Sequence, residues 1–288
     1  MRDDRPSETA LKVALTMVTL QAKPGWKDKL PPGVAELSER LILSANAFGY
    51  SPVLMRMSKR RWMVGFYNFA DRIMPGMFEG LGERKIFMNA EVERALKDGF
   101  TQVLVLGAGF DTLCLRLAPR YPDVSFFEID HPSTARAKRK GVEDIGQPSN
   151  LTLIPADLGE TRMVDVLGDD PGWDKHKQTM IVMEGLLYYL KPDDVLDVFS
   201  QALELTGDQS CVAFSHVLNK FQQGWTQPLL RLIGEPWLSS ASASELPTYI
   251  GGGWQIIRAE QPELDGHFEA FALAEKAEAN AAIDRTFE

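Results

Sequence analysis

The stretch that most constrains the fold joins two apolar runs through a glycine turn. The first run, residues 103–106, ends abruptly at Gly107 and Gly109, and a helix-like segment follows. The second run, residues 124–129, ends in Asp130. A strand, a glycine turn, a helix and a second strand with a terminal acid form the opening of a nucleotide-binding βαβ unit. The pattern therefore predicts an α/β fold with a mostly parallel sheet.

Each residue type in this unit suits a bound nucleotide. Gly107 and Gly109, on either side of Ala108, allow a sharp turn and a close approach of a ligand to the backbone. The helix start behind them presents N–H groups to an anion, and Asp111 fits its N-cap. Asp130 lies at the carboxyl edge of the sheet, where open α/β sheets bind ligands, and can accept hydrogen bonds from a ribose.

The dinucleotide fingerprint is incomplete in this loop. It requires a third glycine three residues after Gly109, and the chain has Thr112 there. This difference weakens the NAD interpretation. A nicotinamide-dependent oxidoreductase nevertheless stays an alternative, because it would use the same βαβ unit.

Five motifs carry a resemblance to a known family, and in chain order they are Arg84-Lys85, Leu106 to Thr112, Phe127 to Pro132, Ala156 to Leu158 and Glu184 to Leu190. They resemble the leucine carboxyl methyltransferase family, a branch of the class I S-adenosylmethionine-dependent methyltransferases that includes bacterial polyketide O-methyltransferases. The resemblance implies a Rossmann-like fold. Its mostly parallel seven-stranded sheet would have a reversed last strand, and N-terminal helices would form a lid over the site.

The resemblance also assigns roles toward S-adenosylmethionine. It implies that Arg84 pairs with the carboxylate of the methionine moiety, that Asp157 accepts the adenine amino group and that the Leu158 backbone meets an adenine ring nitrogen. Glu184 follows an apolar strand, where a buried acid needs a cation, and the cofactor offers an ammonium and a sulfonium. The other expected cofactor-binding residues are Gly107, Ala108, Gly109, Asp111 and Asp130.

The acceptor side of the site is less defined. Tyr189 matches a tyrosine of the family and is expected to face substrate, and His216 ends the fifth predicted strand as the candidate base for a hydroxyl acceptor. A carboxylate acceptor is already ionised near neutral pH and needs no base. Because no decisive base motif is present, the sequence favours O-methylation of a carboxylate on a small molecule. The alternatives are a hydroxyl or phenol of polyketide type, and a non-catalytic protein that binds an adenosyl ligand.

The 288 residues are expected to form one domain. Residues 1–83 would be a helical lead-in and lid, residues 84–216 the cofactor-binding core, and residues 217–288 a lid insertion with a C-terminal hairpin. The lead-in contains a stretch rich in methionine and aromatic residues between Ser51 and Gly82, which is typical either of core or of the lining of an apolar ligand site.

Composition narrows the class of protein further. With 44% hydrophobic and 25% charged residues the chain reads as soluble and globular, and no segment reaches the length of a transmembrane helix. A net charge of −9 argues against nucleic-acid binding, apart from the basic run at 59–61.

Cys114 and Cys211 have neither disulfide nor metal-ligand spacing, so no metal is expected and a reducing cytoplasm fits. A solvated face is expected for the basic residues of the helix at 133–142, which are Arg136, Lys138, Arg139 and Lys140.

Overall fold

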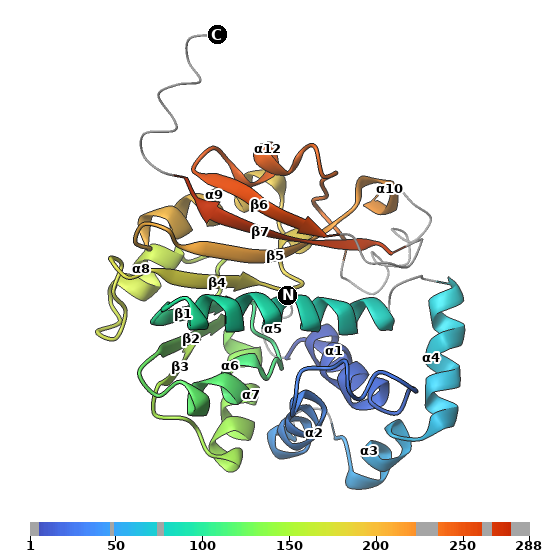
Figure 1. The fold of residues 1–288 in the computed structure, drawn as a ribbon. Helices are drawn as coiled ribbons and strands as arrows, with labels where there is room; N and C mark the ends of the chain where they lie inside the picture. Colours follow the sequence, from blue (N-terminus) through green and yellow to red (C-terminus); the bar gives the residue numbers. More distant parts are fainter. Residues whose placement is uncertain (1–5, 47–48, 74–77, 223–235, 261–266, 278–288) are drawn as a thin grey trace, which may run out of the picture.

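The computed structural model describes residues 6–46, 49–73, 78–222, 236–260 and 267–277. A seven-stranded sheet forms its centre, in the order β3-β2-β1-β4-β5-β7-β6 (Figure 1). The strands are β1 (Gln102–Leu106), β2 (Ser125–Asp130), β3 (Leu151–Pro155), β4 (Thr179–Met183), β5 (Cys211–Val217), β6 (Trp254–Glu260) and β7 (Glu269–Lys276). Strands β1 to β5 pair in parallel, and β7 is antiparallel to both of its neighbours. The predicted parallel sheet with a reversed last strand is confirmed, and the reversed strand lies between β5 and β6.

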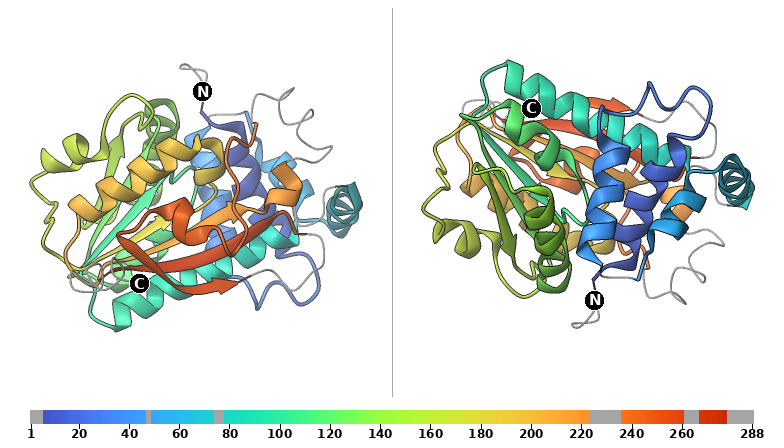
Figure 2. Two further views of the ribbon diagram at one scale, coloured as in Figure 1. Left: turned by 90° about the horizontal axis from the view of Figure 1, so that it is seen from above. Right: turned by 90° about the horizontal axis from the view of Figure 1, so that it is seen from below.

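Helices cover both faces of the sheet (Figure 2), which explains why β1 and β4 are apolar after their first residue. The helices are α1 (Glu8–Leu20), α2 (Val34–Ala45), α3 (Pro52–Ser58), α4 (Arg61–Ile73), α5 (Glu79–Lys97), α6 (Leu113–Leu117), α7 (Pro132–Ile145), α8 (Met163–Gly168), α9 (Pro192–Glu204), α10 (Asn219–Gln222) and α12 (Leu246–Ile250). One core cluster joins a face of the sheet to α5, α6 and α7, and a second joins the other face to α8, α9 and α12 (Figure 2).

The start of α1 lies against the glycine loop between β1 and α6. Ser7 caps α1, and its backbone N–H donates to Thr134 Oγ1 of α7 at 3.0 Å. A Cβ added at Gly109 would lie 2.8 Å from the Cβ of Ala10. The first turn of α1 therefore covers the loop, and only a glycine at position 109 leaves room for it.

Several boundaries differ from those predicted. The helix expected from Asp111 is only the five-residue α6, because Pro119 follows in a 3₁₀ turn, Ala118–Arg120, that ends the α-helical hydrogen bonding. His216 is the penultimate residue of β5, not its last. Within residues 217–288, where a C-terminal hairpin is expected, β6 and β7 pair antiparallel. Most of the predicted lid insertion, residues 223–235, and the C-terminal tail from 278 lie outside the described residues.

Replacing Gly109 tests how closely α1 covers the loop. Gly109 and Gly99 both have positive φ, 49° and 95°, but a Cβ at Gly99 would meet nothing within 4 Å. Each Gly→Ala change should cost about 1 kcal/mol for the left-handed backbone. Gly109→Ala should lose a further ~1–3 kcal/mol of unfolding free energy in urea denaturation, because the new methyl group meets α1.

The companion change Ala10→Gly removes the carbon that the new methyl group would meet. In a double-mutant cycle it should therefore restore part of the loss caused by Gly109→Ala. Equal losses for Gly99→Ala and Gly109→Ala, with no coupling to position 10, would contradict this packing.

Candidate active site

The carboxyl ends of the four neighbouring parallel strands β1 to β4 meet at one edge of the sheet. The glycine loop follows β1, Asp130 ends β2, Asp157 follows β3 and Glu184 follows β4. The structure thus brings the predicted strand-end acids to the edge at which open α/β sheets bind ligands.

The glycine loop is held by the end of β2. Gly107 and Gly109 have φ of 63° and 49°, conformations that favour glycine. The N–H groups of Gly107 and Ala108 donate to the carbonyl of Ile129, and the N–H of Gly109 donates to the Asp130 carboxylate. Burial raises the pKa of Asp130, against the opposing effect of the Gly109 N–H. Asp130 therefore fixes the loop as well as facing the ligand edge.

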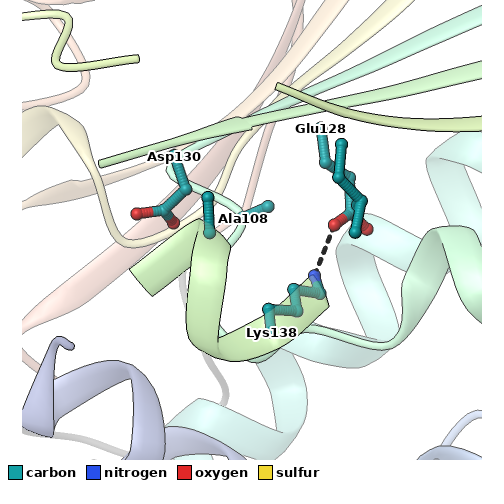
Figure 3. A pocket seen from close by; sticks show the side chains of 6 residues that line it. Ala108, Glu128, Asp130 and Lys138 are labelled. Carbon is teal, nitrogen blue, oxygen red and sulfur yellow. Dashed lines mark ion pairs between the residues drawn. The ribbon is translucent and has the colours of Figure 1, made fainter. Parts of the chain in front are cut away.

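A small pocket of about 10 Å³ lies behind this loop (Figure 3). Lys138 of α7 reaches into it and lies 2.5 Å from Glu128 of β2, and both side chains are almost fully buried. The expectation that Lys138 belongs to a solvated face is wrong, because an acid in the middle of β2 requires a buried cation. The pocket has room for about one water molecule and is therefore too small to be the nucleotide site.

Asp111 precedes α6 and takes part in backbone hydrogen bonds and an ion pair. Its Oδ1 accepts hydrogen bonds from the N–H groups of Thr112 at 2.6 Å and Leu113 at 3.2 Å, but the N-cap position of α6 is Thr112, one residue later than predicted. The Nζ of Lys85 lies 2.9 Å from the same oxygen. Burial by itself would raise the pKa of Asp111, but Lys85 and the more distant Lys138 lower it from 3.8 to about 2.

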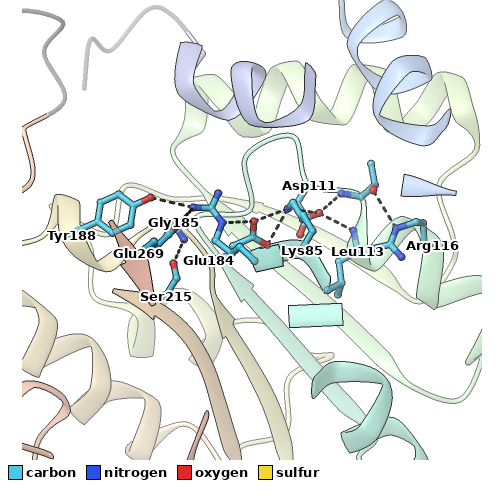
Figure 4. A network of polar contacts seen from close by, with 11 residues as sticks. Lys85, Asp111, Leu113, Arg116, Glu184, Gly185, Tyr188, Ser215 and Glu269 are labelled. Carbon is cyan, nitrogen blue, oxygen red and sulfur yellow. Dashed lines mark hydrogen bonds and ion pairs between the residues drawn. The ribbon is translucent and has the colours of Figure 1, made fainter. Parts of the chain in front are cut away.

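Asp111 and Lys85 belong to a larger group of buried charges, here called the charged cluster, which consists of Arg84, Lys85, Asp111, Glu184 and Glu269 (Figure 4). Arg84 Nε donates to Glu184 Oε1 at 2.9 Å, and its Nη1 donates to the two carboxylate oxygens of Glu269 at 2.8 and 2.9 Å. Lys85 Nζ lies 2.9 Å from Glu184 Oε1. None of the five side chains is more than 9% exposed.

Two members of the charged cluster had no predicted role. The sequence indicates Lys85 only as part of a motif and assigns no role to Glu269. A signal for Glu269 exists in the sequence, since it is an acid inside the apolar run FEAFALA, where an unpaired charge would be costly. Nothing in the sequence indicates its partner, because Arg84 is 185 residues away along the chain.

The adjacent tyrosines take different positions beside the charged cluster. Tyr188 is buried, and Arg84 Nη1 donates to its hydroxyl at 3.3 Å. Burial and Glu269 raise the pKa of Tyr188 well above its usual value. Tyr189 is half-buried, with its ring 4.7 Å from that of Tyr188. Both border an apolar wall in which the rings of Trp237 and Phe268 are stacked 5.0 Å apart.

His216 lies on the other face of β5. Side chains alternate along a strand, and Ser215, the neighbour of His216, accepts a hydrogen bond from the N–H of Gly185 next to the charged cluster. His216 instead shares the face of Phe214, and its Nδ1 lies 3.0 Å from the carbonyl oxygen of Ala241. Burial lowers the pKa of His216 from 6.5 to about 4. The structure therefore places His216 on the face of β5 opposite Ser215 and does not bring it to the charged cluster.

His267 lies next to the start of α5, where its Nε2 is 3.9 Å from Glu83 Oε2. It precedes Glu269 by two residues and is 4% exposed, with its ring against Gly80 in the first turn of α5. Neither ring nitrogen has a hydrogen-bond partner among the described residues, and burial lowers the pKa of His267.

The predicted adenine-binding residues are more open than the charged cluster. The Asp157 side chain is 38% exposed, and its Oδ1 accepts a hydrogen bond from the N–H of Gly159 at 2.9 Å. His131 Nε2 lies 3.4 Å from the other oxygen. Leu158 is half-buried. The edge of the sheet is therefore polar and partly exposed on the β3 side, and charged and enclosed on the β4 side.

The arrangement fits S-adenosylmethionine. The charged cluster contains three carboxylates and two cations, an excess of one negative charge. S-adenosylmethionine carries an ammonium, a sulfonium and a carboxylate, an excess of one positive charge. Arg84 and Lys85 would hold the ligand's carboxylate, Glu184 or Glu269 its cations, and Asp130 the ribose.

Comparisons with known proteins agree with this geometry. The sequence profile of the leucine carboxyl methyltransferase family matches residues 40–203. A protein of Mycolicibacterium vanbaalenii, named as an S-adenosyl-L-methionine-dependent methyltransferase, is 30% identical over 242 residues, which cover 78% of this chain and 77% of that protein. YktD of Bacillus subtilis, similarly named, is 29% identical over 120 residues, 41% of this chain and 39% of its own length.

The fold is also found among solved structures. A protein of Thermobifida fusca, named as a methyltransferase, superimposes with a TM-score of 0.59 at 18% sequence identity, over 88% of this chain and 98% of that one. The fold and the family match define an S-adenosylmethionine-dependent methyltransferase of class I. The chain belongs to the leucine carboxyl methyltransferase family, its cofactor is S-adenosylmethionine, and the nicotinamide alternative is wrong.

Cofactor binding should depend on the two strand-end acids that face the ligand edge. Asp130→Asn and Glu184→Gln should each weaken the binding of S-adenosylhomocysteine at least about tenfold in calorimetry, because each removes a charge or an acceptor from the site. Asp123→Asn, just before the opposite end of β2, is the matched control and should leave the affinity unchanged. Unchanged affinity in either site variant would remove that residue from the cofactor site.

The buried His216 should make the fold sensitive to acid. Its folded pKa of about 4 lies below the usual 6.5, so the folded state binds fewer protons than the unfolded state. The contribution of neutral His216 to the free energy of unfolding is fully present above pH 6.5. This free energy should fall by on the order of 3 kcal/mol as the pH drops from 6.5 to 4. His216→Asn keeps a donor for Ala241 without titrating, so its unfolding free energy should fall less over this range. His176→Asn, at an exposed position, should follow the wild type.

Proposed function

We propose that this methyltransferase methylates a carboxylate oxygen of a small molecule. The observation that carries the proposal is the position of His216, the residue predicted to serve as a base. It faces away from the charged cluster, is hydrogen-bonded to Ala241 and has a strongly lowered pKa. Tyr188 is equally unsuited, because its hydroxyl is bound by Arg84 and its pKa is raised. A carboxylate acceptor needs neither residue, since it is already ionised near neutral pH.

The charged cluster would then act by orientation. S-adenosylmethionine, when bound, supplies an electrophilic methyl group on its sulfonium. Arg84 and Lys85 fix the methionine end of the ligand through charge-assisted hydrogen bonds. Glu184 pairs with both of these side chains and keeps them in place. The residues would hold the methyl group of the ligand toward the carboxylate oxygen of the acceptor, and no residue would have to remove a proton. Such orientation can lower the barrier by about 7–11 kcal/mol.

The wall beside the charged cluster supports a small acceptor with an apolar or aromatic body. Tyr188, Tyr189, Trp237 and Phe268 form this wall, and Tyr188 links it to Arg84. Aromatic side chains with a few convergent polar groups are typical of small-molecule sites.

A hydroxyl or phenol acceptor is the second candidate, and His267 favours it. A buried imidazole without a hydrogen-bond partner among the described residues, two positions from Glu269, could accept the proton that a phenol of pKa near 10 must lose.

The product itself distinguishes the two acceptors. Small aromatic and aliphatic acids and phenols would be incubated with the enzyme and S-adenosylmethionine carrying a labelled methyl group. A carboxylate acceptor gives a methyl ester, which mild alkali hydrolyses to volatile labelled methanol, whereas a methyl ether is stable. Release of methanol is the expected result, and alkali-stable label would contradict the carboxylate proposal.

The pH profile gives a second, independent test. Single-turnover rates with a carboxylate acceptor should be constant above about pH 6 and should survive both His216→Ala and His267→Ala. A rate that rises with pH and loses this rise only in His267→Ala would establish the hydroxyl alternative.

A further inference from the structure

An exposed apolar surface lies on α3 and α4. Of the nine large apolar side chains that the described residues expose, six belong to these two helices, with exposed fractions of 42–63%. They form what is called here the hairpin face and are Val53, Leu54, Met57, Trp62, Phe66 and Phe69. Apolar patches of this kind on a soluble chain mark interaction sites.

The aromatic members of the hairpin face lie along one side of α4. Trp62, Phe66 and Phe69 follow the i, i+4, i+7 spacing that places side chains on one helix face. The other side of α4 is fixed to the body, because Val64 is buried and the ring of Tyr67 stacks on Phe78 at 4.7 Å. Figure 1 shows α4 at the margin of the molecule, with α3 beside it. The aromatic rings therefore face solvent on a helix whose position is set by packing.

Basic residues flank these rings at the turn between the two helices. Arg56, Arg60 and Arg61 are exposed, and their side chains form no ion pair within the described part of the chain. Lys59 pairs with Glu39. Residues 51–73 contain five basic residues and one acid, a net charge of +4 in a chain whose total is −9. The hairpin thus opposes the charge of the rest of the protein.

We infer that the hairpin face docks on the surface of an anionic lipid bilayer. Aromatic rings beside arginines are the composition of helices that lie in the bilayer interface, with the rings among the acyl chains and the cations at the lipid phosphates. No helix among the described residues could span a bilayer, so the contact is peripheral. A second copy of the chain fits less well, because a two-fold contact through this face would bring the arginines of both copies together.

Vesicle sedimentation tests the inference on the full chain. The protein should pellet with vesicles of phosphatidylcholine and phosphatidylglycerol, and at least about tenfold less with phosphatidylcholine alone, because each basic residue near an anionic surface favours binding about fivefold. Raising the salt concentration from about 0.1 to about 0.5 M should weaken the binding, since it screens the surface charge.

Paired variants separate the two contributions. Arg60→Glu with Arg61→Glu, and Phe66→Ser with Phe69→Ser, should each lower the partition coefficient at least about tenfold. The matched controls change exposed residues elsewhere: Lys27→Glu with Lys175→Glu for charge, and Leu196→Ser with Ile257→Ser for apolar surface. Both controls should bind vesicles like the wild type. Circular dichroism would confirm that all four variants are folded.

Three outcomes would overturn the inference. One is wild-type binding that is absent or independent of lipid charge. Another is an equal loss of binding in the controls. The third is a protein that does not bind vesicles but forms a dimer in analytical ultracentrifugation, if Phe66→Ser with Phe69→Ser dissociates that dimer. This result would assign the hairpin face to contact with a second copy of the chain.

Discussion

The buried guanidinium of Arg84 is the interaction on which the active-site edge depends. It joins three segments that are distant in the sequence: α5, the loop after β4 through Glu184, and β7 through Glu269. Burial would lower the pKa of Arg84, but Glu269, Tyr188 and Glu184 together raise it well above its usual value, so the charge is retained. Loss of the guanidinium would leave the buried Glu269 without its cation and Glu184 with Lys85 alone, which is why such a group is difficult to replace.

Buried acids with nearby cations also fix the conformation of the glycine loop. The loop lies between two acids, Asp111 at the start of α6 and Asp130 at the end of β2, and each accepts backbone N–H groups. Each acid has a cation in its surroundings, Lys85 beside Asp111 and Lys138 behind Asp130. The backbone that would meet the cofactor is therefore fixed before any ligand arrives, which reduces the ordering that binding requires.

Charge is distributed unevenly over the molecule. The enclosed site has an excess of carboxylates and suits a cationic ligand, whereas the hairpin of α3 and α4 is basic and carries exposed aromatic rings. The net charge of −9 conceals this separation. The chain thus has an enclosed acidic region and an exposed basic, aromatic one, and the second is visible only when exposure is known residue by residue.

The sequence by itself determined the sheet, the glycine loop and the acids at its edge. Apolar runs bounded by turn residues specify the strands locally, and parallel strands bring their carboxyl ends together, so Asp130, Asp157 and Glu184 could be placed without coordinates. Only the tertiary structure decided the partners of Arg84, the burial of Lys138 and the face on which His216 lies. These depend on which distant segments meet and on the pairing of buried charges, and no local pattern in the chain encodes either.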